Sequence, residues 1–184
     1  MLVSLLRQAL GSSLQIFKED NEILEFMDIK ELIRKLQLNV HPEGGFYRET
    51  YRSSESTTTG KGLNRSISTA IYYLLEKENK SLLHRIQSDE LWFFHQGQSM
   101  EIIVIQDNQL TTIHLGNDID GGEVPQAIIP ANSWFASSIK NDTGYSLVSC
   151  TVAPGFDFSD FELANREELI QQYPHLKNII EKYT

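Results

Sequence analysis

The stretch LLHRIQSDELWFFHQGQSMEIIVI, residues 82–105, decides the fold that this sequence predicts. It contains three runs rich in apolar and aromatic residues, each short enough for a single strand. Turn-forming pairs, Ser88-Asp89 and Gln96-Gly97, separate the runs. No helical spacing intervenes, so the stretch predicts three consecutive antiparallel strands.

Similar segments continue on both sides of this stretch. The further strands are predicted at residues 46–52, 68–75, 110–115, 126–130, 133–139 and 145–152. Residues 53–62, SSESTTTGKG, are polar and small and predict a loop. Regularly spaced strands without crossover helices indicate an antiparallel sandwich or barrel, and therefore an all-β core.

Helices are predicted only at the two ends of this core. Asp28 and Glu31 form a capping-box pattern for a helix that ends near Leu38. The C-terminal part, residues 159–184, has helical spacing, with a second short helix opened by Pro174. We therefore expect one domain over residues 28–184, with its barrel at about 46–155 and a helical tail packed outside. Residues 1–27 are expected to form an N-terminal extension.

Composition excludes several classes of partner. The 184 residues carry 16 Lys and Arg against 25 Asp and Glu, a formal net charge of −9. Such a chain has no basic surface with which to bind nucleic acid or an anionic membrane. Cys150 is the only cysteine, which excludes an internal disulfide and indicates a reducing compartment, so we expect a cytoplasmic protein.

Polar residues inside the apolar runs are the candidate functional groups. Burying His84 or Glu90 without a partner would be costly. Strand alternation allows His84 and Glu90 to face the barrel interior together with Trp92 and Phe94, while His95 falls on the opposite face. The alternation thus separates the two histidines and predicts His84 and Glu90 as a pair.

The spacing of His84, Glu90 and Gly97 resembles the first motif of the cupin superfamily, in which two histidines, a glutamate and a glycine build a metal site in a jelly-roll barrel. The sequence departs from that motif where Ile86 takes the place of the second histidine. In the second motif, Asn132 takes the place of the glycine, and Trp134-Phe135 stands where the last histidine belongs. One histidine and one carboxylate fall short of the three or more ligands that hold a catalytic metal, so a divalent metal is disfavoured.

Five separated blocks resemble a narrower group, the small single-domain cupins catalogued as a domain of unknown function. The blocks are LIRKLQLNVHPEGGFYRETYRS, STAIYYLL, HRIQSDELWFFHQG, IIPANSWFAS and SCTVAPGFDFSDFELANREELIQQYP, within residues 28 to about 184. The resemblance implies a single jelly-roll (cupin) β-barrel, usually a homodimer, with a central pocket like those of sugar-nucleotide epimerases and seed storage proteins. It implies no established reaction.

The leading hypothesis is a cupin that binds a small organic ligand in its barrel and acts as an isomerase or epimerase. His84 has an intrinsic pKa suited to moving a proton, with Glu90 orienting its ring or serving as the base. The candidate ligand-binding residues are Arg48, Tyr72, Trp92, Phe94 and Trp134. Arg48 is a candidate for binding an anionic group and the aromatic residues for walling the pocket, although aromatic side chains belong to the core by default.

Two alternatives stay open. A metal-dependent cupin oxygenase or isomerase would recruit a third ligand from His41 or His114. A non-enzymatic storage-like or ligand-sensing module would bind without turnover. In either case a homodimer is expected, formed through apolar outer faces such as those of Leu91, Phe93, Ile103 and Ile105.

Overall fold

The computed structural model describes residues 29–77 and 79–184, and these residues divide into two units, one ending at Gln37 and one beginning at Leu38. In the first unit, residues 29–36 form the predicted helix. Glu31 Oε1 pairs with Lys35 at 2.9 Å and with Arg34 at 3.7 Å along its exposed side. The predicted cap at Asp28 and the predicted extension, residues 1–27, lie outside the described residues.

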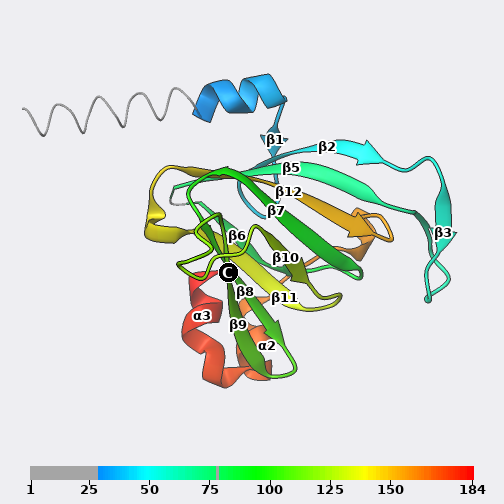
Figure 1. Cartoon of the computed structure of the whole chain (residues 1–184). Helices are drawn as coiled ribbons and strands as arrows, with labels where there is room; N and C mark the ends of the chain where they lie inside the picture. Colours follow the sequence, from blue (N-terminus) through cyan, green and yellow to red (C-terminus); the bar gives the residue numbers. More distant parts are fainter. Residues whose placement is uncertain (1–28, 78) are drawn as a thin grey trace, which may run out of the picture. The chain divides into compact units, whose positions relative to one another are not determined.

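The second unit is a jelly roll of antiparallel strands (Figure 1). One sheet has the order β1-β2-β5-β12-β7-β10, the other β13-β6-β11-β8-β9, and β3 and β4 form a separate hairpin. The strands are β1 (Asn39–Val40), β2 (Phe46–Arg52), β3 (Ser56–Thr58), β4 (Asn64–Ser66), β5 (Thr69–Glu76), β6 (Lys80–Arg85), β7 (Asp89–Gly97), β8 (Met100–Gln106), β9 (Gln109–Leu115), β10 (Gln126–Ile129), β11 (Trp134–Ile139), β12 (Tyr145–Ala153) and β13 (Glu162–Leu163). The predicted all-β core and jelly-roll fold are confirmed.

The two sheets pack face to face and bury one side of each strand. Alternate residues of β5, β7, β8 and β12 supply the buried core, as strand geometry requires. At its centre, the Trp92 ring lies 5.7 Å from that of Tyr73 and 6.3 Å from that of Phe135. This part of the barrel interior is filled by side chains, which confines any open space to the remainder.

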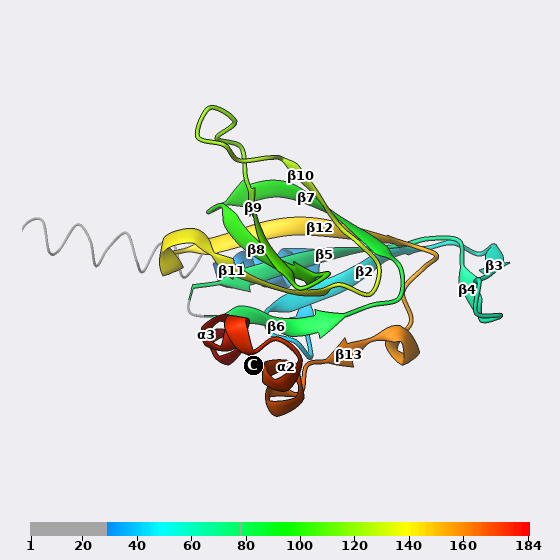
Figure 2. The ribbon, with the colours of Figure 1, turned by 90° about the horizontal axis from the view of Figure 1, so that it is seen from below.

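The C-terminal tail covers the outer face of the second sheet (Figure 2). It comprises α2 (Arg166–Gln172), a 3-10 turn (Pro174–Leu176) and α3 (Lys177–Lys182). A second apolar cluster joins Leu169, Ile180 and Tyr183 to the sheet. The predicted packing of the tail outside the barrel is therefore confirmed. No helix within residues 29–77 and 79–184 is both long and apolar enough to cross a membrane.

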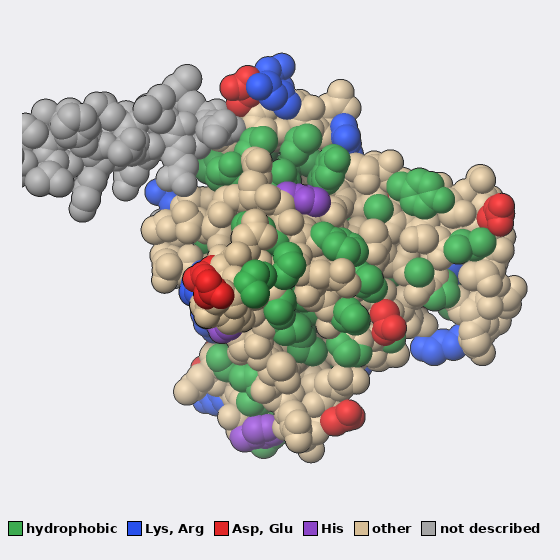
Figure 3. Space-filling model, in the orientation of Figure 1, with side chains coloured by type: hydrophobic (Ala, Val, Ile, Leu, Met, Phe, Trp, Pro, Cys, Tyr) green, Lys and Arg blue, Asp and Glu red, His purple; other side chains and the backbone are tan. Residues whose placement is uncertain are grey.

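The position of the tail corrects one expectation. The sequence predicts Ile103 and Ile105 on an open outer face available to a second copy of the chain, but they are 4% and 1% exposed beneath the tail. Large apolar side chains remain exposed elsewhere: among the described residues they include Val40, Tyr51, Ile119, Ile128 and Phe158. Hydrophobic side chains are visible among polar ones across the face seen in Figure 3. The homodimer stays a prediction.

A second correction concerns residues 53–62, for which the sequence predicts a loop. Ser56–Thr58 instead pairs with Asn64–Ser66 as the β3–β4 hairpin. Its strands are three residues each and lie largely exposed. Without an apolar face, this segment lacks the alternation by which a strand is recognised in sequence.

Candidate functional site

One end of the barrel is hollow. A cavity of about 300 Å³ lies between the two sheets, at the low end of the range for small-molecule sites. Its walls come from the starts of β5 and β7, the ends of β6 and β12, strand β2, and the segment that follows β12. The lining residues with polar or titratable side chains are His41, Glu43, Tyr47, Glu49, Arg52, Thr69, His84, Glu90, Cys150 and Asp157.

A tight turn between β1 and β2 brings Glu43 into the cavity. The amide of Gly44 donates to the carbonyl of His41 at 3.1 Å, and the amide of His41 donates to the carbonyl of Gly45 at 3.0 Å. Gly44 and Gly45 have φ angles of 114° and 73°, which side-chain-bearing residues adopt only with strain. The hydroxyl of Tyr73 donates to the carbonyl of Gly44 at 2.8 Å and fixes the turn to the core.

Replacing Gly44 with alanine is expected to destabilise the protein by about 2 kcal/mol, because the strain of a positive φ is joined by a collision. A Cβ at this position would lie 2.2 Å from the backbone carbonyl oxygen of Lys80. Gly62→Ala is the matched control, since Gly62 also has a positive φ, 79°, but nothing lies within 4 Å of its Cβ position. Urea unfolding should show the larger loss for Gly44→Ala. Equal losses would mean that the Lys80 contact is relieved at no cost.

His84 and Glu43 form a buried ion pair at the centre of the cavity wall. Nε2 of His84 lies 2.8 Å from Oε2 of Glu43, and Nδ1 lies 2.7 Å from the carbonyl oxygen of Leu82. The Leu82 carbonyl only accepts, so Nδ1 of His84 carries a proton, and with Glu43 ionised Nε2 donates as well, which makes the ring an imidazolium. Burial alone lowers the pKa of His84, but the charge and hydrogen bond of Glu43, with the Leu82 carbonyl, raise it above its ordinary value. Burial raises the pKa of Glu43, but the opposing effect of His84 leaves it lowered.

His41 completes the pair from the other side of Glu43. The backbone amide of Glu43 donates to Nδ1 of His41 at 3.3 Å, so that nitrogen carries no proton. The pKa of His41 is lowered, first by burial and then by the positive charge of His84, although Glu43 opposes both. His41 is therefore the neutral histidine of the site and His84 the charged one.

Glu90 is the second buried acid of the cavity. It is 8% exposed, near the start of β7, and burial raises its pKa to about 7. The charge of His84 lowers that pKa and the charge of Glu43 raises it further. Glu90 thus changes its protonation state near neutral pH, in contrast to Glu43, which is held ionised.

The structure brings together some of the predicted site residues. His84 and Glu90 both line the cavity, as strand alternation indicated, and His95 lies exposed away from it. The partner of His84 is Glu43, however, not Glu90. Glu43 lies far from His84 in sequence, and the only signal for it was the pair of glycines that let its backbone approach the barrel closely.

The other predicted ligand-binding residues do not line the cavity. Trp92 and Phe94 belong to the filled part of the barrel core. Arg48 and Tyr72 lie on the outer side of the first sheet, where the guanidinium of Arg48 stands 5.8 Å from the ring centre of Tyr72. Their sequence neighbours Tyr47 and Ile71 lie on the opposite face of the sheet and line the cavity instead.

Trp134 also lies outside the cavity. It points away from the barrel interior into the cluster beneath the C-terminal tail, with the guanidinium of Arg85 4.4 Å from its ring. Its neighbour Phe135 points inward and lies 4.0 Å from the ring of His84. The prediction that Trp92 and Trp134 wall the pocket is therefore corrected: aromatic walls come from Tyr47, Phe156, Phe158 and Phe161.

The residues of the cavity do not fit the metal site of the cupin motif. Both ring nitrogens of His84 already donate to protein acceptors, so coordination would require breaking the 2.8 Å contact with Glu43 or the 2.7 Å contact with Leu82. His41 does reach the cavity, but His114 lies on β9, beside Glu101. Within the described ranges, no group of three or more His, Cys, Asp or Glu side chains is placed to hold a metal ion.

Two antiparallel sheets closed around a cavity are the barrel architecture that cupins have. Its structure matches oxalate decarboxylase of Bacillus subtilis with a TM-score of 0.51 at 12% identity, over 79% of this chain and 36% of that one, which shows the fold alone. Residues 30–164 match the family described as "Cupin superfamily (DUF985)", and the chain belongs to that family.

Relatives share both sequence and structure with the chain. Protein SO0799 of Shewanella oneidensis is 42% identical, with a TM-score of 0.77 over 84% of this chain and 95% of that one. A hypothetical protein of Leishmania major is 36% identical, with a TM-score of 0.79 over 84% and 97%. An uncharacterised protein of Saccharomyces cerevisiae, YML079W, is 31% identical over 155 residues, 76% of this chain and 77% of its own. None of these names carries a reaction or a ligand.

Proposed function

We propose that the protein binds a small organic molecule in the barrel cavity and moves a proton on it, as isomerases and epimerases do, with Glu90 as the general base. The observation that carries this proposal is the state of Glu90. It is a buried carboxyl on the wall of a ligand-sized cavity, with a pKa of about 7. A base that titrates near the working pH is the most effective one.

Glu90 is better placed for this role than His84. Both nitrogens of the His84 ring are engaged by Glu43 and Leu82, so the ring has no lone pair to offer a substrate. Its positive charge nevertheless lowers the pKa of Glu90, and so acts inside the cavity. Because Glu43 offsets this charge at 2.8 Å, the role assigned to His84 is to tune the pKa of Glu90 and not to contact the substrate.

Glu90 would take up one proton and return one in each reaction cycle. The carboxylate of Glu90 takes a proton from a carbon next to a carbonyl group, the electron pair of that C–H bond forms a carbon–carbon double bond, and the π pair of the carbonyl moves onto its oxygen. The protonated Glu90 then returns a proton to carbon, which restores the carbonyl. The carbon and the face to which the proton returns determine the product.

Deuterium exchange tests this proposal even while the substrate is unidentified. We would incubate the protein in D₂O with the small-molecule extract of the cells that express it, and find by mass spectrometry any compound that gains deuterium at carbon. We expect at least one such compound with the unaltered protein and none with Glu90→Gln. Glu181→Gln, which removes an exposed carboxylate from α3, is the control and should exchange normally.

Other outcomes would decide against the proposal. Exchange that persists in Glu90→Gln would transfer the role of base to another residue. If no compound exchanged but one co-purified with the protein in native mass spectrometry, the site would be a non-enzymatic binding module. If exchange appeared only with added divalent metal, the metal-dependent alternative would hold.

A further inference from the structure

Charge is unevenly distributed around the cavity. Of the described residues that line it, four are acids, Glu43, Glu49, Glu90 and Asp157, whereas Arg52 is the one arginine and none is a lysine. His84 adds a positive charge, but it is held by Glu43 at 2.8 Å. Whether a ligand with a negative group could bind depends therefore on Arg52 and on the arginines near the mouth.

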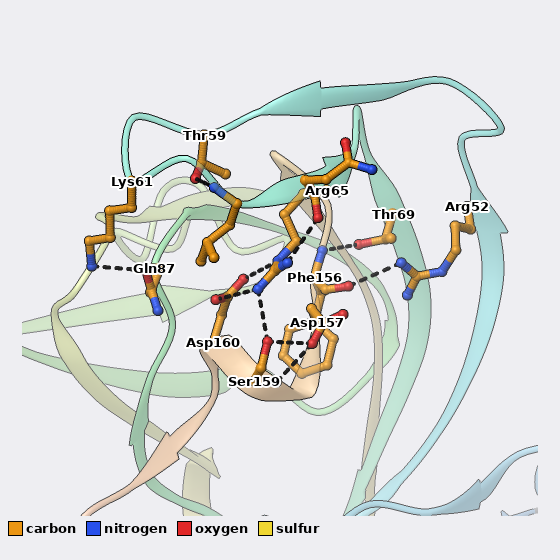
Figure 4. Close-up of polar contacts among 12 residues, drawn as sticks. Arg52, Thr59, Lys61, Arg65, Thr69, Gln87, Phe156, Asp157, Ser159 and Asp160 are labelled. Atoms are coloured by element: carbon orange, nitrogen blue, oxygen red, sulfur yellow. Dashed lines mark hydrogen bonds and ion pairs between the residues drawn. The ribbon is translucent and has the colours of Figure 1, made fainter.

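Arg52 is already engaged by protein acceptors. Its Nε and one terminal nitrogen donate to the two carboxylate oxygens of Glu49 at 2.9 and 2.7 Å, a bidentate pair. The other terminal nitrogen donates to the carbonyl of Phe156 at 3.1 Å (Figure 4). An anionic ligand would have to displace Glu49 from this arginine.

Two further arginines at this end of the barrel are also paired with acids. Arg65, on the β3–β4 hairpin, donates to both carboxylate oxygens of Asp160 at 2.6 and 2.9 Å and to the hydroxyl of Ser159 at 2.8 Å (Figure 4). Arg85, on β6, donates to Glu162 at 2.8 Å. Both acids belong to the segment between β12 and α2, so these arginines fix the wall of the cavity and do not line it.

Two acids of the cavity have no cationic partner at hydrogen-bond distance among the residues that the structure describes. Asp157 accepts hydrogen bonds from the amide and the hydroxyl of Ser159, at 2.9 and 2.6 Å, and both bonds reach the same oxygen, Oδ1. Glu90, which is more buried than Asp157, is the other. Both can accept hydrogen bonds from a ligand, and a negative group beside the ionised form of either acid is repelled, at a cost in free energy.

We infer that the ligand is an uncharged or positively charged molecule rich in hydrogen-bond donors, and that the cavity rejects phosphates and carboxylates. This inference rests on the proposed function, because it concerns the ligand of the same cavity. Glu49 is assigned a role in specificity: it neutralises Arg52 and so removes the cation in the cavity lining that an anionic ligand could use.

Ligand-observed NMR with a library of small metabolites tests the inference. The compounds are sorted beforehand into uncharged, cationic and anionic groups of matched size. Binding is assigned to the cavity when it is lost in Val152→Trp, or in Ile71→Trp if the first variant does not fold, since both residues line the cavity. We expect cavity-dependent binding from the uncharged and cationic groups and none from the anionic group.

Glu49→Gln is the decisive variant, because it frees Arg52 while changing few atoms. We expect it to raise the affinity of anionic compounds by about tenfold, the effect of one charge-assisted hydrogen bond, and to leave uncharged compounds unchanged. Glu181→Gln removes the same charge from the surface and should change neither group. Anionic compounds bound by the unaltered protein, or no gain in Glu49→Gln, would overturn the inference. A complete lack of cavity-dependent binding would instead overturn the proposed function.

Discussion

Replacing Glu43 with glutamine is expected to lower the free energy of unfolding by about 3 kcal/mol at pH 6, because it leaves the imidazolium of His84 buried without its counter-charge. Glu43 and His84 are 5% and 3% exposed and lie 2.8 Å apart. The remaining acceptor, the Leu82 carbonyl, cannot neutralise a charge. Urea unfolding measures the loss, and NMR titration should show a lower pKa for His84 in the variant.

The effect of the pair depends on pH in a defined direction. The pKa of Glu43 is lowered in the folded protein, so its contribution is present above the unfolded value of 4.5 and is lost as pH falls through the folded pKa. The pKa of His84 is raised, so its contribution is present below 6.5 and is lost as pH rises through the folded pKa. The destabilisation by Glu43→Gln should therefore be largest between about pH 4.5 and 6.5.

A double-mutant cycle separates the pair from the loss of each side chain. We expect Glu43→Gln and His84→Gln combined to cost less than the sum of the two single variants, because the second change removes the charge that the first leaves unpaired. Glu162→Gln, which breaks the exposed pair with Arg85, is the surface control and should cost under about 1 kcal/mol. Additive single and double losses would show that the two side chains do not interact.

The fold could be predicted from the sequence because its strands carry local signals. Segments such as 46–52 and 145–152 either alternate between apolar and polar residues or are continuously apolar, and turn residues bound them. Both agree with the observed β2 and β12. The β3–β4 hairpin could not be recognised, since it buries no apolar face. Its place is fixed by long-range contacts instead, among them the Arg65 pair with Asp160, 95 residues away.

The candidate site was only half predictable, for a different physical reason. Alternation tells which residues share a face of a strand, but not which face looks into the barrel. Every residue of β11 is buried, because the barrel core covers one face and the C-terminal tail the other. The sequence therefore cannot distinguish Trp134 from Phe135. Trp134 is predicted to line the pocket, but it faces the tail.

Buried charges that pair across the sequence are the other feature that local pattern cannot show. His84 and Glu90 can be found because each interrupts an apolar strand. Glu43 interrupts nothing: it lies in a polar turn, and the residues that bury it are distant in sequence. Tyr73 and Leu82 cover this turn, and the amide of Leu82 donates to the carbonyl of Glu43 at 2.9 Å. These contacts place Glu43 in the site.

Replacing Glu90 with glutamine is expected to stabilise the protein increasingly as pH rises, even though the same change removes the proposed base. The folded pKa of Glu90, about 7, lies above its unfolded value of 4.5. A raised pKa means that the folded state binds more protons between these two values, so the contribution of Glu90 is fully present below pH 4.5 and is lost as pH rises through 7. Between pH 5 and pH 8 the unaltered protein should therefore lose about 2 kcal/mol relative to Glu90→Gln.

Urea unfolding of both proteins at pH 5 and pH 8 measures this difference directly. Glu181→Gln, whose carboxylate is exposed, should show no such change with pH relative to the unaltered protein. A constant difference between Glu90→Gln and the unaltered protein would mean that Glu90 is ionised throughout, and would remove the reason for assigning it as the base. A difference that grows with pH, together with loss of deuterium exchange in Glu90→Gln, would show that the protein keeps a buried acid that destabilises it because its chemistry depends on that acid. Active sites commonly sacrifice stability in this way.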